Sequence, residues 1–252
     1  MTSAFNVDIS DIDILPQNLT FSEDKLSEFM QDKAFTKKQD EKKVLDGKRL
    51  EESWFKPVEA DFFISHKSED ADKARRLGAY LQSKEKTVFI DSSIWGDIAE
   101  LQRLIDNDYC MNEDKSFYIY DKRNKSTSYT HMLLANALLK TIANCKNFVF
   151  LNTPNSVKAA DAVTDMAETN SPWIYFEINV ANSLLIEMGR ENFAMRENEN
   201  GNMIEMAFEA DLQRFDKVNV EGLLKKIDIE LPQESKEMRY REIFERILRG
   251  EA

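Results

Sequence analysis

The feature that most constrains this fold is a set of short apolar runs that alternate with segments of helical periodicity. The runs are residues 60–65 (ADFFIS), 87–91 (TVFID), 147–152 (NFVFLN) and 203–208 (MIEMAF). They lack the polar and apolar alternation of half-exposed strands, which is typical of parallel strands buried on both faces. Crossover helices would cover those faces. The pattern therefore predicts an α/β fold with a flavodoxin-like, doubly wound parallel sheet.

Helical segments with regularly spaced apolar residues separate the predicted strands. The first places Ala74, Leu77, Gly78 and Leu81 on one face. The other two are residues 131–142 (HMLLANALLKTI) and 173–188 (WIYFEINVANSLLIEM). Each segment precedes an apolar run, as expected for strands joined by helical crossovers.

Three regions follow from this organisation. Residues 1–57 are polar and contain a helix-like segment at 22–30, so they are interpreted as a helical N-terminal extension. Residues 58–230 form the predicted domain. Residues 231–252 are expected to form a C-terminal amphipathic helix that docks on the domain or on a partner. Its apolar stripe consists of Tyr240, Ile243, Phe244, Ile247 and Leu248.

Composition excludes several classes of function. The net charge is −12 and the isoelectric point is near 4.8, so phosphate backbones and anionic membrane surfaces would be repelled. No secretory leader or run of about 18 apolar residues is present, which predicts a cytoplasmic protein without membrane association. Two cysteines and two histidines give too few ligands for a zinc site, so we expect structural, reduced thiols and no metal.

Ligands of open parallel sheets bind beyond the carboxyl ends of the strands. A ligand is therefore expected beside the loops that follow Ser65, Asp91 and Asn152. In the first loop, Ser68 suits the start of a helix whose free N–H groups could bind a phosphate, and Lys67 would add a cation. The alternative is an ordinary solvated turn, because the acidic residues that follow satisfy the helix dipole.

The second loop, residues 91–98 (DSSIWGDI), presents a tryptophan. Trp95 would either stack on a ligand or fold back over the edge of the sheet. Further along, residues 120–126 (YDKRNKS) form a basic patch in an acidic chain. This patch, with Arg123 at its centre, is the best source of charge to neutralise a phosphate, although such runs are often only solvated.

Residues 171–177 (SPWIYFE) combine a helix start with an unusually placed acid. Ser171 can cap the helix and Pro172 suits its first position. Glu177 lies one turn after Trp173 and shares a face with apolar residues. Because burial penalises an ionised carboxylate, such a residue is either paired structurally or held for chemistry. The residues alone leave these two alternatives open.

In this order, the motifs resemble a bacterial Toll/interleukin-1 receptor (TIR) domain over residues 59–220. FFISHKSEDADKARRL resembles the opening strand and its continuation, TVFID the second strand, and DSSIWGDI the BB-loop region. FVFLNTPNS resembles a later core strand, and SPWIYFE the serine, tryptophan and glutamate signature.

The resemblance implies that the chain cleaves the nicotinamide–ribose bond of NAD, with Glu177 as the catalytic residue. Loss of neutral nicotinamide leaves an oxocarbenium-like cation, which a carboxylate can stabilise without a metal or cofactor. NAD is then a substrate. The residues expected to contact it are Ser65, His66, Lys67, Asp91, Trp95, Arg123 and Trp173.

The region from YDKRNKS to LLKTI, together with SPWIYFE, is similar to TIR proteins of the Thoeris antiphage system. This similarity implies a cyclic or conjugated ADP-ribose messenger, a separate effector protein as its receptor, and possible TIR self-association. The alternatives are a simple NAD hydrolase, a non-catalytic TIR scaffold in which Glu177 is structural, and a nucleoside deoxyribosyltransferase-like enzyme. Receiver-type signalling is less favoured, because the first strand ends in Ser65 rather than in a cluster of acids.

Overall fold

A five-stranded parallel sheet forms the centre of the molecule. The computed structural model describes residues 1–22, 36–39, 42–90, 92, 98–157, 167–187 and 208–230. The strands of the sheet are β1 (Ser3–Asp8), β4 (Phe62–Ser65), β5 (Val88–Phe89), β6 (Asn147–Asn152) and β9 (Asp216–Asn219). Their order is β5-β4-β6-β1-β9, and each neighbouring pair is parallel. The predicted α/β architecture with a parallel sheet is therefore confirmed.

Helices pack on both sides of this sheet, and two small antiparallel pairs lie outside it. The helices are α1 (Gly47–Trp54), α2 (Ala71–Gln82), α4 (Ile98–Ile105), α5 (Tyr120–Asn144), α6 (Pro172–Glu187) and α7 (Val220–Lys226). The short helical turns are η1 (Ile12–Ile14), η3 (Ser68–Asp70) and the π-helical η4 (Asp106–Cys110). The antiparallel pairs are β2 (Thr36–Gln39) with β3 (Lys42–Leu45), and β7 (Ala167–Thr169) with β8 (Phe208–Ala210).

The two faces of the sheet carry different side chains, because successive strand residues point to opposite sides. On the face covered by α1, α4, α5 and α6, called the α6 face, Phe63 stacks between Phe89 and Phe148 with ring centroids 5.4 and 5.5 Å apart. On the face covered by α2, α7 and η1, called the α2 face, Ile64 and Val149 are fully buried. Burial on both faces explains the unalternating apolar runs.

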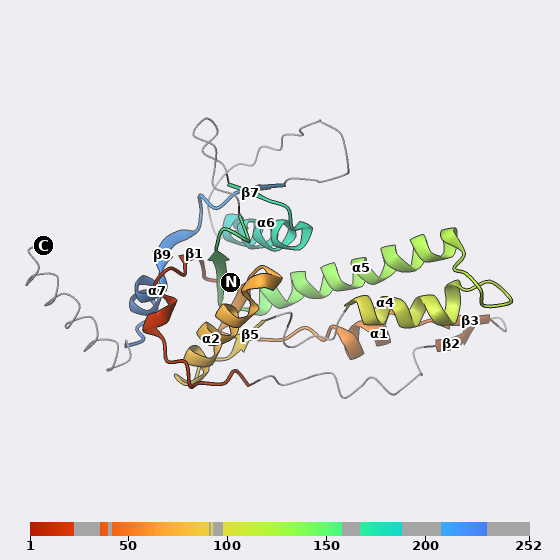
Figure 1. Cartoon of the computed structure of the whole chain (residues 1–252), viewed down its shortest axis with the longest axis horizontal. Helices are drawn as coiled ribbons and strands as arrows, with labels where there is room; N and C mark the ends of the chain where they lie inside the picture. Colours follow the sequence, from red (N-terminus) through yellow and green to blue (C-terminus); the bar gives the residue numbers. More distant parts are fainter. Residues whose placement is uncertain are drawn as a thin grey trace, which may run out of the picture.

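Helices α4 and α5 form an arm that extends away from the sheet (Figure 1). The two helices pack against each other and are joined through η4 and an isolated bridge between Met111 and Tyr118. Helix α5 has 25 residues, which corresponds to a length of about 37 Å. The segment predicted as a helix at 131–142 is therefore only its second half, and the basic patch at 120–126 is its first turns.

The N-terminal region corrects the predicted domain boundary. Residues 1–57 were expected to be a helical extension, yet β1 lies between β6 and β9 in the sheet. Its side chains Phe5 and Val7 are buried on the α2 face. Without β1, the strand order β5-β4-β6-β9 would resemble the flavodoxin pattern. The N-terminal strand β1 is inserted between β6 and β9, at the fourth position of the sheet. The expectation failed because polar side chains in SAFNVD hide the strand signal.

The fourth predicted strand is also corrected. Residues 203–207 lie outside the described residues, and Phe208 begins β8, which pairs antiparallel with β7 beside α6. The sheet instead ends with β9, whose sequence DKVN is mostly polar because it is an exposed edge strand. The predicted helix at 22–30 lies outside the described residues except for its first residue. The predicted helix at 231–252 lies wholly outside them.

Candidate functional site

The strand order creates a topological switch between β4 and β6. From β4 the chain passes through α2 to β5 on one side, whereas β6 lies on the other side of β4. At such a point the loops that follow the two strands leave the sheet in opposite directions. The crevice beyond the carboxyl ends of these strands is the usual place for a ligand. Ser65 is the last residue of β4, and Asn152 is the last of β6.

Ser65 and Glu177 are brought together at this point. The Ser65 Oγ donates a hydrogen bond to Glu177 Oε2 at 2.6 Å, although 112 residues separate them in sequence. Both are buried, with 1% and 3% of their surface exposed. This short hydrogen bond satisfies one oxygen of a carboxyl group that is buried in the interior. The contact joins the end of a central strand to the middle of α6.

Helix α6 positions Glu177 through its start and its packing. The helix begins at Pro172, and the Ser171 Oγ accepts a hydrogen bond from the Ile174 N–H at 3.4 Å, as the sequence predicts for a cap. Ile174 and Ile178, which flank the turn that carries Glu177, are buried in the cluster on the α6 face. The glutamate therefore points to the interior with the apolar side of its helix.

Trp173 lies one turn before Glu177 and packs against the arm helix. Its ring meets the His131 ring of α5 edge to face, with centroids 5.6 Å apart and planes at 84°. The indole is partly buried and contacts the α6-face cluster. Trp173 therefore packs against the core and also forms an aromatic surface one helical turn from the Glu177 carboxylate.

The loop that follows β4 carries His66 and Lys67, both partly exposed. The His66 Nε2 lies 3.1 Å from the Ser92 Oγ, so this side chain links the loops after β4 and β5. Lys67 precedes η3, and its carbonyl accepts the Asp70 N–H at 2.8 Å. His66 and Lys67 therefore directly follow Ser65 at the carboxyl end of β4, beside the loop after β5.

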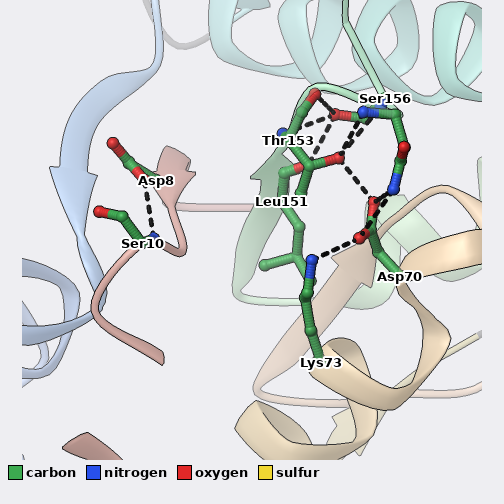
Figure 2. Close-up of polar contacts among 8 residues, drawn as sticks. Asp8, Ser10, Asp70, Lys73, Leu151, Thr153 and Ser156 are labelled. Atoms are coloured by element: carbon green, nitrogen blue, oxygen red, sulfur yellow. Dashed lines mark hydrogen bonds and ion pairs between the residues drawn. The ribbon is translucent and has the colours of Figure 1, made fainter. Parts of the chain in front are cut away.

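Asp70 clamps this loop to the loop that follows β6 (Figure 2). Its carboxylate accepts hydrogen bonds from Thr153 Oγ1 at 2.6 Å, from Asn155 Nδ2 at 3.2 Å and from Lys73 Nζ at 2.9 Å. Burial alone would raise the pKa of Asp70, but these donors outweigh it and hold the pKa below its ordinary value. Asp70 is therefore ionised at neutral pH and fixes both loops.

Sequence reasoning treated this aspartate only as a helix-dipole residue and missed the clamp. The available signal was the polar run TPNS directly after strand β6, which is typical of a turn at the carboxyl end of a strand.

Arg123 is placed away from Glu177. It lies in the first turn of α5, eight residues before His131, or about 12 Å along the helix axis. The Arg123 Nε donates to Asp106 Oδ2 at 3.1 Å, and its guanidinium lies 5.1 Å from the Tyr118 ring centroid. The expected phosphate contact at Arg123 is therefore not brought together with the Ser65 and Glu177 pair.

Asp106 is the centre of a polar network inside the arm. Its Oδ1 accepts the Ser126 hydroxyl at 2.6 Å and the Gln102 amide at 2.8 Å. Burial would raise the pKa of Asp106, but these hydrogen bonds, with that from Arg123, lower it below its ordinary value. Sequence reasoning did not identify this network, since a π-helical turn brings its members together.

Asp91 and Trp95 lie outside the described residues. Within the described part of the chain, no group of three or more His, Cys, Asp or Glu side chains could hold a metal ion. Cys110 and Cys145 are free and buried, and burial raises the pKa of Cys145 to about 12, so that thiol stays protonated.

Comparison with known proteins finds no matching family model, curated protein or solved structure. Among the helices that the structure describes, none has the length and apolar character needed to cross a membrane.

Proposed function

We propose that this chain is a TIR-type enzyme that cleaves the bond between nicotinamide and ribose in NAD, with Glu177 as the catalytic carboxylate. The observation that supports it most is the buried contact of Ser65 with Glu177 at the switch point of the sheet. Two residues selected from the sequence as site residues lie within 2.6 Å of each other at the edge where open α/β sheets bind ligands.

In the proposed reaction the bond from ribose C1′ to the nicotinamide nitrogen breaks, and its electron pair leaves with neutral nicotinamide. The ribosyl group becomes an oxocarbenium-like cation, which the Glu177 carboxylate stabilises. The Ser65 hydroxyl holds the Oε2 of this carboxylate in place and so fixes the orientation of the group. Because the site is buried, water screens this attraction only weakly. Substrate entry then requires the side chains over Glu177 to move aside.

The fate of the cation determines the product. Capture by water gives ADP-ribose and releases a proton, whereas capture by another nucleophile of the same or a second molecule gives a cyclic or conjugated product. We propose a diffusible ADP-ribose derivative that activates a separate effector in antiphage defence, on the strength of the Thoeris-like sequence. Simple NAD hydrolysis is the alternative outcome at the same site.

A Glu177→Gln substitution tests the catalytic assignment. The amide keeps the volume and can still accept the Ser65 hydrogen bond, but it lacks the charge, so NAD consumption should fall by about 100-fold or more. Purified protein is mixed with NAD, and the products are separated by chromatography. Glu168→Gln, an exposed glutamate of β7, is the matched control and should retain activity. Turnover by folded Glu177→Gln at the wild-type rate would disprove the proposal.

The messenger proposal needs its own experiment. Small molecules filtered from activated cells should switch on the cognate effector, and the same filtrate from Glu177→Gln cells should not. An inert filtrate from cells whose NAD still falls would leave simple NAD hydrolysis as the activity.

A non-catalytic scaffold is the second candidate, favoured by one observation. The arm exposes large apolar side chains that a second copy of the chain could cover, and this fits the expected self-association. They are Leu104, Phe117, Tyr120, Tyr129, Met132 and Leu139. A protein that assembles through this surface and leaves NAD intact, in purified form and in activated cells, would favour the scaffold.

A further inference from the structure

A second group of polar side chains lies on the α6 face of the sheet, two strands away from Ser65. The register aligns Ser65 with Phe150 of β6, and Phe150 with Asn6 of β1. Two residues further along, Asp8 is aligned with Asn152. Because side chains alternate along a strand, Asn6, Asp8 and Asn152 are on the same face as Ser65. They form a polar row at the carboxyl-terminal edge.

The acceptor oxygens of this row are incompletely used. The Asp8 Oδ1 accepts the Ser10 N–H at 2.8 Å (Figure 2), whereas its Oδ2 accepts no hydrogen bond from the described residues. The Asn152 side chain likewise has no hydrogen-bond partner there. Directly behind Asp8, Asn6 is 6% exposed, and within the described part of the chain its buried Oδ1 accepts no hydrogen bond.

The chemistry of these groups selects a class of ligand. A carboxylate repels phosphate, and one carboxylate beside amide groups supplies too few ligands for a divalent cation, which needs about six or more oxygens including several from carboxylates or water. Carboxylate and amide oxygens instead accept hydrogen bonds from hydroxyl groups. An acidic residue at a strand end that binds ribose hydroxyls is an established solution in dinucleotide-binding sheets. The row therefore suits a vicinal diol.

We infer that Asp8, supported by Asn152 and Asn6, binds the 2′,3′-diol of the adenosine ribose. This inference rests on the proposed function, in which Glu177 acts on the other ribose of the same dinucleotide. Two spacings between strands, about 10 Å, separate β4 from β1. NAD carries two riboses joined by a pyrophosphate, so one ribose at each end of this span places the pyrophosphate over the end of β6.

The test uses purified full-length protein and two probes, ADP and 2′,3′-dideoxy-ADP, with affinities measured by calorimetry. Neither probe carries the nicotinamide ribose, so binding is independent of cleavage. Wild-type protein should bind ADP about tenfold or more tightly than the dideoxy form. Asp8→Asn retains an acceptor for Ser10, and Asn152→Ala removes the neighbouring amide. Both should weaken ADP binding, Asp8→Asn by about tenfold, and leave dideoxy-ADP unchanged.

Asp72→Asn, on the exposed surface of α2, is the control for loss of one negative charge and should leave both affinities unchanged. The inference is overturned if wild-type protein binds no ADP, if it binds both probes equally, or if Asp8→Asn keeps the full preference for ADP. NAD cleavage in Glu177→Gln protein would disprove the proposed function, while an ADP preference that depends on Asp8 would still establish the diol site.

Discussion

The switch point and the arm each bury a carboxylate that accepts a serine hydroxyl at 2.6 Å, but they assemble it differently. Asp106 takes Gln102, Arg123 and Ser126 from within 20 residues of itself. Glu177 takes Ser65 from 112 residues away, across two elements that meet only when the sheet has formed. A network built from one hairpin fixes the shape of that hairpin. A contact at the end of a central strand is placed where a ligand can use it.

The largest expected effect separates the two carboxylates by stability. Asp106→Ala leaves the Ser126, Gln102 and Arg123 groups without their common acceptor, so we expect a loss of about 3 kcal/mol in the free energy of unfolding. Glu177→Gln keeps an acceptor for Ser65 and should cost less than about 1 kcal/mol. Urea unfolding of the two variants measures both values. Equal losses would remove the distinction between the regions.

The second prediction compares how tightly two helices pack: α2, which follows the switch-point strand β4, and α1, near the base of the arm. A Cβ on Gly78 of α2 would lie 2.8 Å from the Phe21 ring and 3.1 Å from Ile90. Gly78→Ala should therefore destabilise the protein by about 2 kcal/mol. Near the base of the arm, a Cβ on Gly47 would meet Leu133 only at 3.9 Å. Gly47→Ala is the matched control, and thermal unfolding should show a change within about 0.5 kcal/mol.

The third prediction compares how the two serines affect stability and turnover. Ser126→Ala should lower the free energy of unfolding by about 1.5 kcal/mol and leave NAD turnover per folded molecule unchanged. Ser65→Ala removes the hydrogen bond that holds Glu177 Oε2, so turnover should fall about tenfold. Activity assays and urea unfolding are run on both variants. If Ser126→Ala lowers turnover as much as Ser65→Ala does, the arm belongs to the active site.

The smallest expected effect is a pH dependence at the amino-terminal edge of the sheet, far from either carboxylate. The hydrogen bond from Lys146 lowers the pKa of Asp61 to about 2. Because the folded pKa lies below the unfolded value, the stabilisation is complete above about pH 4 and is lost as the pH falls toward 2. Solvent screening of the exposed lysine reduces it to about 1 kcal/mol. The difference between wild type and Asp61→Asn in unfolding experiments should therefore vanish only as the pH falls below about 2.

The sequence was sufficient for the elements that bury side chains on both faces. Strands β4, β5 and β6 are apolar apart from Ser65 and the terminal asparagines of β6. Helix α2 carries a regular apolar stripe, and α6 is predominantly apolar. Strand β1 escaped prediction because Asn6 and Asp8 fall on one face and make the segment look like a polar extension. Strand β9 escaped because an edge strand needs little apolar surface.

Two members of the candidate site could be selected from the sequence, but their contact could not. Ser65 was selected by its place at a strand end and Glu177 by its apolar helix face, yet no spacing in the sequence links the two. The ion pair of Arg123 with Asp106 could not be predicted from the sequence, because a π-helical turn sets the orientation of Asp106.

The position of β1 in the sheet has a consequence for how the protein is made. Its two neighbours, β6 and β9, are synthesised about 140 and 210 residues later, as the strand bounds show. At roughly 5–20 residues per second, β1 waits on the order of 7–30 s before β6 is complete. During this time both of its backbone edges are unpaired, and its apolar side chains Phe5 and Val7 are uncovered. The sheet therefore closes late around the segment that was translated long before its neighbours, and until then the unpaired edges of β1 are open to aggregation.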